Sequence, residues 1–379
     1  MINDRPLRIL IVDDTIVYRK IVTDVLSNLP DVEVVGSAHN GKAAITKITS
    51  LKPDLLTLDI EMPEMNGLEV LEYIKDKGID VGAIMLSTLT HEGGEMTMKA
   101  LDLGAFDFIL KPQEGSMAEN TEALKKTIVP ILKAFARRNE IKHLLKGKIS
   151  PKEGDIDDKR SSESDQVVHL MHAVSSRLRQ KSEIVAIGIS TGGPKALAQM
   201  MPSLPSSLDV PILIVQHMPP MFTMSLAKSL DTKCSFDVRE AKDGEPVVSN
   251  VALIAPGGKQ MKIMAGGDGK SRVIKITDDP SENNCKPSVD YLFRSIAHHY
   301  VGRATGVIMT GMGSDGFLGL QLMKKSGSTI IAQNGETSVV YGMPKGPIDA
   351  GIVDIIAPLD MIASEICLTV KQTVIKNSL

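Results

Sequence analysis

The chain has 379 residues, and at about 150 residues per domain this length predicts two or three domains. The 46 acidic and 43 basic side chains leave a net charge of −3, and only 3% of residues are aromatic, so no nucleic-acid partner is expected. Three widely separated cysteines favour a reducing compartment over a disulfide framework. Neither a signal peptide nor an apolar run of roughly 18 residues stands out, so we expect a cytoplasmic protein without membrane insertion.

The first third of the chain alternates short apolar runs with amphipathic, helix-like stretches. This alternation is typical of a parallel sheet covered by helices on both faces. It predicts one compact α/β domain with five strands. The predicted strands are residues 7–12, 32–35, 55–58, 83–86 and 108–110.

Three carboxylates follow strands of this predicted sheet. Asp13 and Asp14 come after the first strand, and Asp59 ends the third. Because the carboxyl ends of parallel strands meet in one crevice, we expect the three acids to lie together, where Mg²⁺ is their natural partner. Ser87 or Thr88, at the end of the fourth strand, adds a hydroxyl, and Lys111, after the fifth, adds a cation. Helix capping is the common role of such acids, but the whole set in this order favours the pocket.

These residues resemble the receiver domain of two-component response regulators over roughly residues 5–135. The resemblance is carried by VDD at 12–14, LDIEMP at 58–63, Gly67, Ser87 and KP at 111–112. It implies a flavodoxin-like, five-stranded parallel sheet in which Asp59 accepts a phosphoryl group. Asp13, Asp14 and Asp59 would hold Mg²⁺, while Ser87 and Lys111 would contact the phosphoryl group. Phe108 matches the switch aromatic of that family, and ordinary core packing explains it equally well.

The composition changes after this domain. Residues 121–145 have an increasingly basic helical pattern, and we expect Pro130 to start, kink or break that helix. Residues 150–165 contain almost no apolar side chain and cannot offset the entropy cost of ordering, so they predict a linker. Residues 167–178 regain apolar side chains and predict a short helix.

The second half resumes the strand and helix alternation, which predicts a larger, doubly wound and mostly parallel α/β domain. Within GISTGGP at 188–194, Ser190 stands at a strand-to-helix turn of the Gly-x-Ser-x-Gly type, which exposes a nucleophilic hydroxyl. A glycine-rich turn of this kind also cradles phosphate in other proteins, so the motif alone is weak. The predicted strands are residues 184–189, 210–215, 251–254, 305–309 and 329–332.

A serine nucleophile needs a base, and the base needs an orienting carboxylate. His217 follows the next predicted strand, and Asp315 lies in a glycine-rich loop after the strand at 305–309. All three side chains therefore stand beyond the carboxyl ends of predicted parallel strands and can converge. Their order, Ser190, His217 and Asp315, differs from the Ser, Asp, His order of the α/β-hydrolases.

The second half resembles the chemotaxis-type (CheB-type) protein-glutamate methylesterases. The motifs GISTGGP, QHMP, APGG, PSVDYLF, TGMGSDG and YGMPKG occur in that family's order. The resemblance implies that Ser190 is the nucleophile, His217 the general base and Asp315 its orienting partner, with Thr191 and Met312 at the oxyanion and substrate site and no cofactor. We therefore expect a receiver domain over 1–138, a partly disordered linker over 139–182 and a methylesterase domain over 183–379.

The implied activity is hydrolysis of γ-glutamyl methyl esters on methyl-accepting chemotaxis receptors, switched on when a chemotaxis histidine kinase phosphorylates the receiver. The family also allows deamidation of receptor glutamines. By resemblance, the unphosphorylated receiver covers the active site. A hydrolase of another acyl substrate and a non-catalytic signalling adaptor are the alternatives.

The chain departs from the family pattern at two positions. Gln260 and Cys285 stand where the family commonly has histidine. Neither is a triad position, so we expect effects on local packing or substrate contacts rather than on the chemistry. The His298-His299 pair lacks acidic or cysteine neighbours at metal-binding spacing and is interpreted as ordinary helix residues.

Overall fold

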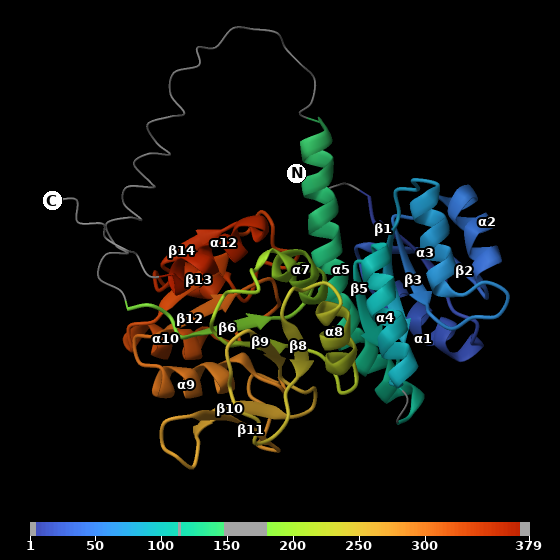
Figure 1. Ribbon diagram of the computed structural model, residues 1–379. Coiled ribbons are helices and arrows are strands. Elements are labelled where there is room, and N and C mark those ends of the chain that lie inside the picture. Colours follow the sequence, from blue (N-terminus) through green and yellow to red (C-terminus); the bar gives the residue numbers. More distant parts are fainter. Residues whose placement is uncertain (1–4, 113–114, 148–179, 372–379) are drawn as a thin grey trace, which may run out of the picture.

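Two α/β domains pack side by side in the computed structural model, which describes residues 5–112, 115–147 and 180–371 (Figure 1). The linker expected at 150–165 and the short helix expected at 167–178 lie outside these residues. Among the helices that the structure does describe, none has both the length and the apolar character to cross a bilayer.

The N-terminal sheet has five parallel strands in the order β2-β1-β3-β4-β5, as the receiver resemblance implies. Alternate residues of β1 serve opposite layers: Ile9 and Ile11 pack with α1 and α5, whereas Leu10 and Val12 pack with α2 and α3. The strands are β1 (Leu7–Val12), β2 (Val32–Ala38), β3 (Leu55–Asp59), β4 (Gly82–Ser87) and β5 (Asp107–Leu110). The helices are α1 (Ile16–Ser27), α2 (Gly41–Leu51), α3 (Gly67–Asp76), α4 (His91–Leu103) and α5 (Met117–Gly147).

Gly67 stands at the start of α3, and Pro130 lies within α5. A Cβ at Gly67 would lie 2.2 Å from the backbone oxygen of Asp59, so only glycine lets α3 begin this close to the end of β3. Pro130 lies inside α5, which neither starts nor ends there. The helix also runs past residue 138, where we expect the receiver to end, and the boundaries at 138 and 182 stay predictions.

The C-terminal domain is built on a seven-stranded sheet in the order β14-β13-β12-β6-β7-β9-β8, in which every pairing is parallel. Helices α7, α8 and α12 cover one face, and α9 and α10 cover the other together with an antiparallel hairpin. The sheet strands are β6 (Ile184–Ile189), β7 (Ile212–Gln216), β8 (Asp237–Glu240), β9 (Val251–Ile254), β12 (Ala304–Ile308), β13 (Thr329–Gln333) and β14 (Ile355–Ala357). The remaining elements are the hairpin β10 (Gln260–Ala265) and β11 (Arg272–Thr277), the 3₁₀ helix η2 (Met201–Ser203), and α7 (Gly193–Met200), α8 (Phe222–Asp231), α9 (Val289–His299), α10 (Phe317–Lys325), α11 (Lys345–Asp349) and α12 (Leu359–Val370).

Sequence analysis found five strands of this domain and missed four. The missed strands β8 and β14 stand at the two edges of the sheet, and β10 and β11 form the separate hairpin. Polar or charged residues interrupt the apolar ones in β8, β10 and β11, and β14 is only three residues long. None of the four therefore shows the longer apolar run that marks the central strands.

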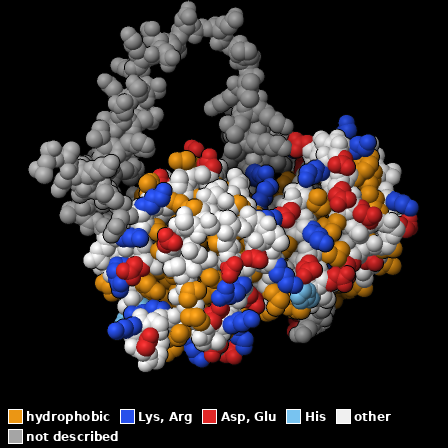
Figure 2. Space-filling model, viewed as in Figure 1, with side chains coloured by type: hydrophobic (Ala, Val, Ile, Leu, Met, Phe, Trp, Pro, Cys, Tyr) orange, Lys and Arg blue, Asp and Glu red, His pale blue; other side chains and the backbone are white. Residues whose placement is uncertain are grey.

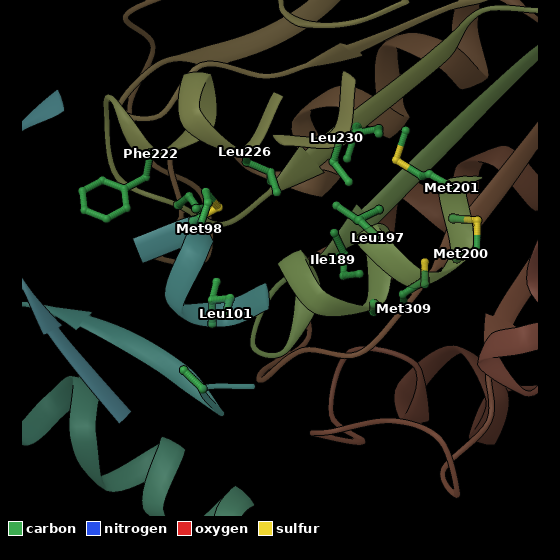
Figure 3. Packing of buried hydrophobic residues seen from close by; sticks show 14 of the residues in the cluster. Met98, Leu101, Ile189, Leu197, Met200, Met201, Phe222, Leu226, Leu230 and Met309 are labelled. Carbon is green, nitrogen blue, oxygen red and sulfur yellow. The ribbon is translucent and has the colours of Figure 1, made fainter. Parts of the chain in front are cut away.

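The domains meet where α4 of the first packs on α7 and α8 of the second. Met98 and Leu101 of α4 belong to the same buried cluster as Leu226 and Leu230 of α8 (Figure 3). The cluster therefore continues from one domain into the other. Surface charges add to this contact: Lys228 lies 3.1 Å from Glu95, and Lys233 lies 2.6 Å from Asp102.

Two residues of β5 also reach the second domain. The Phe108 ring stacks on the Phe222 ring with centroids 5.0 Å apart and planes 2° apart. Asp107, which is buried, accepts a hydrogen bond from the backbone N–H of Gly192 at 3.3 Å. Phe108 thus packs in a core, as one of the two interpretations expects, but this core lies between the domains.

Reversing two charges at this contact should loosen it. The double variant Lys228→Glu and Lys233→Glu places acids opposite Glu95 and Asp102, so that attraction becomes repulsion, although each exposed pair contributes no more than about 1 kcal/mol. Small-angle scattering of the full chain should show a larger radius of gyration. Adding Glu95→Lys and Asp102→Lys should restore the compact form. An unchanged radius in the double variant would show that these pairs do not hold the domains together.

Candidate functional sites

The acidic side chains predicted in the receiver lie together around Lys111. The Lys111 Nζ atom is 2.8 Å from Asp13 Oδ2 and 2.6 Å from Asp59 Oδ2. Asp13, Asp59 and Lys111 are all buried, and Asp14 stands exposed at the rim. One ligand oxygen each from Asp13, Asp14 and Asp59 lie within 4.8 Å of one another. The crevice at the ends of β1, β3 and β5 therefore brings together the residues that the sequence grouped.

The charges of this pocket do not balance. Burial raises the pKa of Asp59 to about 6, Lys111 opposes that rise, and the neighbouring Asp13 and Asp14 add to it. Burial lowers the pKa of Lys111, but Asp59 and Asp13 outweigh burial and raise it. Three carboxylates with one ammonium leave surplus negative charge, and Asp13 Oδ2 has no hydrogen-bond partner beyond its ion pair. An all-oxygen set of this kind fits Mg²⁺.

The hydroxyl of Ser87 is directed toward α4 and not toward the acids. Its Oγ lies 3.0 Å from Thr97 Oγ1 and 3.3 Å from the carbonyl oxygen of Gly93. Both partners belong to the helix that packs on the second domain. Any movement of Ser87 toward Asp59 would therefore remove two contacts of α4.

The second site stands at the carboxyl ends of β6 and β7. Ile189 is paired with Gln216 in these parallel strands, so the next residues, Ser190 and His217, lie side by side. A Cβ at Gly193 would lie 1.9 Å from Gln216 Oε1, so α7 can start this close to β7 only because residue 193 is glycine. Packing against Gln216 therefore explains the glycine at position 193, which directly follows the Gly-x-Ser-x-Gly turn.

Asp315 reaches His217 from the loop that follows β12, the neighbour of β6 on its other side. Asp315 Oδ2 and His217 Nε2 are 2.8 Å apart. The buried carboxylate also accepts hydrogen bonds from the backbone at the start of α9 and from nearby side chains. These donors are Ser288 Oγ, Asn283 Nδ2 and the N–H groups of Val289, Asp290 and Gly316.

The pair has the electrostatics of an ion pair. Burial raises the pKa of Asp315, but the hydrogen bond from His217 and those from the backbone outweigh it and lower the pKa to about 2. Burial lowers the pKa of His217, yet the hydrogen bonds to Asp315 and Cys285 raise it to about 9. Five further donors to Asp315 explain why this carboxylate keeps its charge while buried.

The other ring nitrogen of His217 faces Cys285. Cys285 Sγ lies 3.6 Å from His217 Nδ1. Gln260, the second departure from the family pattern, donates from Nε2 to the carbonyl oxygen of Cys285 at 3.5 Å and accepts from the N–H of Ser288 at 2.8 Å. Among the described residues, no hydrogen bond joins Ser190 Oγ to His217, and the contact of Nδ1 is with Cys285.

Thr191 directly follows Ser190, and Met312 lies in the loop between β12 and Asp315. The carbonyl oxygen of Thr191 accepts a hydrogen bond from Thr310 Oγ1 at 3.0 Å. The Met312 side chain is 41% exposed and lines a cleft of about 270 Å³. The other walls of the cleft are residues 335–341 and part of α5, so the receiver helix closes one side of the space beside Met312.

Sequence analysis missed two supports of the site, Asn283 and Ser288. Ser288 contacts Asp315 from within the PSVD motif, and Asn283 contacts it from the segment before that motif. The signal for Ser288 is its position before α9, where a serine caps the helix. Asn283 has no comparable local pattern and is found only from the fold.

Comparison with known proteins gives the same two units. Residues 9–122 match the family described as response regulator receiver domain, and residues 185–366 match CheB methylesterase. The chain is 54% identical to a protein-glutamate methylesterase/protein-glutamine glutaminase of Desulfotalea psychrophila, over 96% of this chain and 99% of that protein. It is 39% identical to the protein of the same name from Bacillus subtilis, over 97% and 99%. The crystal structure of the Thermotoga maritima CheB methylesterase catalytic domain is 39% identical, with a TM-score of 0.48, and covers 50% of this chain and 99% of its own.

The His217–Asp315 pair predicts how the imidazole titrates. Nuclear magnetic resonance of the ring should give a pKa for His217 of about 9, and Asp315→Asn should lower it by roughly one to three units because the anionic partner is lost. His299, whose pKa burial lowers, serves as an internal control that should not change. If the pKa of His217 stayed the same in Asp315→Asn, the carboxylate would not be its source.

The same shift predicts how stability depends on pH. Because the pKa of His217 is raised above its ordinary value of 6.5, its contribution to stability is complete below about 6.5 and is lost as pH rises through about 9. The melting temperature of the wild type should therefore fall more steeply over this range than that of Asp315→Asn. Parallel melting curves would contradict this assignment.

Proposed function

The chain belongs to the protein-glutamate methylesterase/protein-glutamine glutaminase family, and from that premise we propose how its two sites work together. It is a phosphorylation-controlled hydrolase that removes methyl groups from glutamate γ-methyl esters of chemotaxis receptors during sensory adaptation. The observation that carries the catalytic assignment is the pair of His217 and the buried Asp315 next to Ser190. Such an arrangement speaks against a non-catalytic adaptor.

In the proposed mechanism, Ser190 Oγ attacks the ester carbonyl and the neutral form of His217 takes its proton. Since Asp315 engages Nε2, the base is Nδ1. The imidazolium returns the proton to the departing methoxide, and methanol leaves. Water then attacks the glutamyl ester of Ser190, again with His217 as base, and releases the glutamate and the free serine. General-base catalysis of this kind contributes about 10²–10⁴-fold.

The backbone after the nucleophile is the proposed oxyanion site. The N–H of Thr191 and the start of α7 are suited to a negative oxygen, and Met312 borders the substrate space. The neighbouring N–H of Gly192 donates to Asp107 of the receiver. A receiver carboxylate therefore lies at the end of α7 that would stabilise the transition state. This contact supports the expectation that the docked receiver restrains the esterase.

Asp59 is the proposed phospho-acceptor, with Asp13, Asp14 and Asp59 holding the Mg²⁺ that receiver domains generally bind. When bound, that ion supplies positive charge which offsets the charge of the transferred phosphoryl group. Lys111, which contacts Asp59, would form an ion pair with a phosphoryl oxygen there.

Ser87 connects the phosphorylation site with the domain contact. Its hydroxyl would turn from Gly93 and Thr97 toward the new phosphoryl oxygen. This loosens α4, the helix that carries Met98 and Asp102 against the second domain. Phosphorylation would thereby shift the population toward an undocked, active form.

A receiver implies a phosphodonor kinase, and the esterase implies receptor substrates. We propose a chemotaxis histidine kinase as the donor and the cytoplasmic helices of methyl-accepting receptors as the substrate, which places the enzyme in the cytoplasm. Deamidation of receptor glutamines follows the same acyl chemistry with ammonia as leaving group. That the esterase site needs no cofactor stays a prediction.

Removing the nucleophile should stop the reaction. Ser190→Ala should lower methanol release from methylated receptor membranes by roughly 10⁴-fold or more, because triad members act as a unit. The control is phosphorylation of Asp59 by acetyl phosphate, which should proceed as in the wild type. Equal methanol release by Ser190→Ala and the wild type would refute the serine mechanism.

Removing the phospho-acceptor should uncouple the switch. Asp59→Asn keeps the side-chain size, so the ratio of esterase rates with and without acetyl phosphate should fall to one, while the wild type is activated. Radiolabelled phosphodonor should label the wild type alone. Activation that survives in Asp59→Asn would place the phospho-acceptor elsewhere.

A further inference from the structure

We propose that Cys285 and His217 form a binding site for a thiophilic divalent cation such as Zn²⁺, and that this cation inhibits the esterase. The site would take His217 Nδ1, which is the nitrogen that the mechanism assigns to the proton of Ser190. The inhibitory effect rests on the proposed function, whereas the binding itself does not.

The distance between the two donor atoms fits a zinc ion. Cys285 Sγ and His217 Nδ1 are 3.6 Å apart. Zinc bonds of about 2.3 Å to sulfur and about 2.05 Å to nitrogen, at a tetrahedral angle, place the two ligand atoms about 3.6 Å from each other. The separation of the two donor atoms therefore matches the one that a shared zinc ion requires. Binding forms the Zn–S and Zn–N bonds and releases to the solvent the thiol proton and, when the imidazole is charged, the proton on Nδ1.

Asp315 prepares the imidazole for this role. It accepts the Nε2 proton of His217 at 2.8 Å, which leaves the lone pair of the neutral ring on Nδ1. A carboxylate behind a histidine is the usual outer partner of a zinc ligand. Asp315 itself is occupied by donors such as Ser288 and the N–H of Val289, so it orients the ring and is not a third ligand.

Backbone hydrogen bonds hold Cys285 in position before any cation binds. Its backbone N–H and carbonyl oxygen form a two-way bridge with Glu282, at 2.8 and 3.1 Å, and Gln260 contacts the same carbonyl. The residue is partly exposed, so a cation that binds there can keep water as its remaining ligands. Within the described part of the chain, the other cluster suited to a metal consists of Asp13, Asp14 and Asp59, which offer oxygen alone.

Cobalt reports directly on a thiolate ligand. Co²⁺ added to the reduced full-length protein should produce a sulfur-to-cobalt charge-transfer band in the near ultraviolet, which the all-oxygen receiver site cannot give. The band should be absent from Cys285→Ser and present in Cys234→Ser, the matched control. It should also persist in Ser190→Ala, which tests the site even if the proposed esterase function fails. A band of equal strength in Cys285→Ser and the wild type would overturn the proposal.

Zinc titration tests the inhibitory effect. Methanol release by the wild type and by Cys234→Ser should fall on addition of Zn²⁺ and recover with a chelator. In Cys285→Ser the concentration of Zn²⁺ that gives half inhibition should rise by more than about tenfold. Loss of a residue that only supports a metal ligand already lowers metal affinity about tenfold or more, so loss of a direct ligand should have at least that effect. Equal sensitivity of Cys285→Ser and the wild type would show that zinc acts at another site and would refute the inhibitory role.

Discussion

Parallel strands that end at one edge of a sheet are the constraint on which both sites depend. In the receiver, β1, β3 and β5 deliver Asp13, Asp59 and Lys111 to one crevice. In the second domain, β6 and β7 deliver Ser190 and His217 side by side. Side chains from distant parts of the chain converge because the strands share a direction and an edge. The same constraint gives two chemistries, because one crevice gathers acids around a cation and the other a hydroxyl beside an imidazole.

Helix α4 lies between the phosphorylation site and the second domain. Its inner side holds Ser87 through Gly93 and Thr97, and its outer side packs Met98 and Leu101 against α8 (Figure 3). Charged side chains of both signs are scattered over the described surface on the face shown in Figure 2, and the ion pairs between α4 and the second domain are exposed. Exposed ion pairs contribute little to stability, so the docked state rests mainly on apolar contact. Such an arrangement suits a switch, because a modest change at Ser87 can compete with it.

The sequence predicts the central strands and the acidic pocket because continuous apolar runs and strand-end acids are local signals. It also groups Ser190, His217 and Asp315 through motifs, and the structure places Asp315 beside His217. The edge strand β14 escapes prediction because its three residues are too few to form a clear pattern. Which ring nitrogen faces Asp315 is a property of loop geometry and cannot be read from residue order. The same holds for Asn283, whose contact with Asp315 spans 32 positions.

Gln260 and Cys285 show how two separate departures from a family pattern become one feature in the fold. Gln260 binds the carbonyl of Cys285 and the N–H of Ser288, and Ser288 in turn donates to Asp315. A change at Gln260 therefore acts on both sides of His217, through the thiol at Nδ1 and through the carboxylate at Nε2. Gln260 does not touch the reacting atoms in the proposed mechanism, whereas Cys285 lies against Nδ1, the nitrogen that acts as the base. Together they determine what the imidazole meets when no substrate is bound. In this chain the thiol of Cys285 lies beside the imidazole when no substrate is bound. A thiol is a soft metal ligand, so the proposed site should prefer thiophilic cations to Mg²⁺.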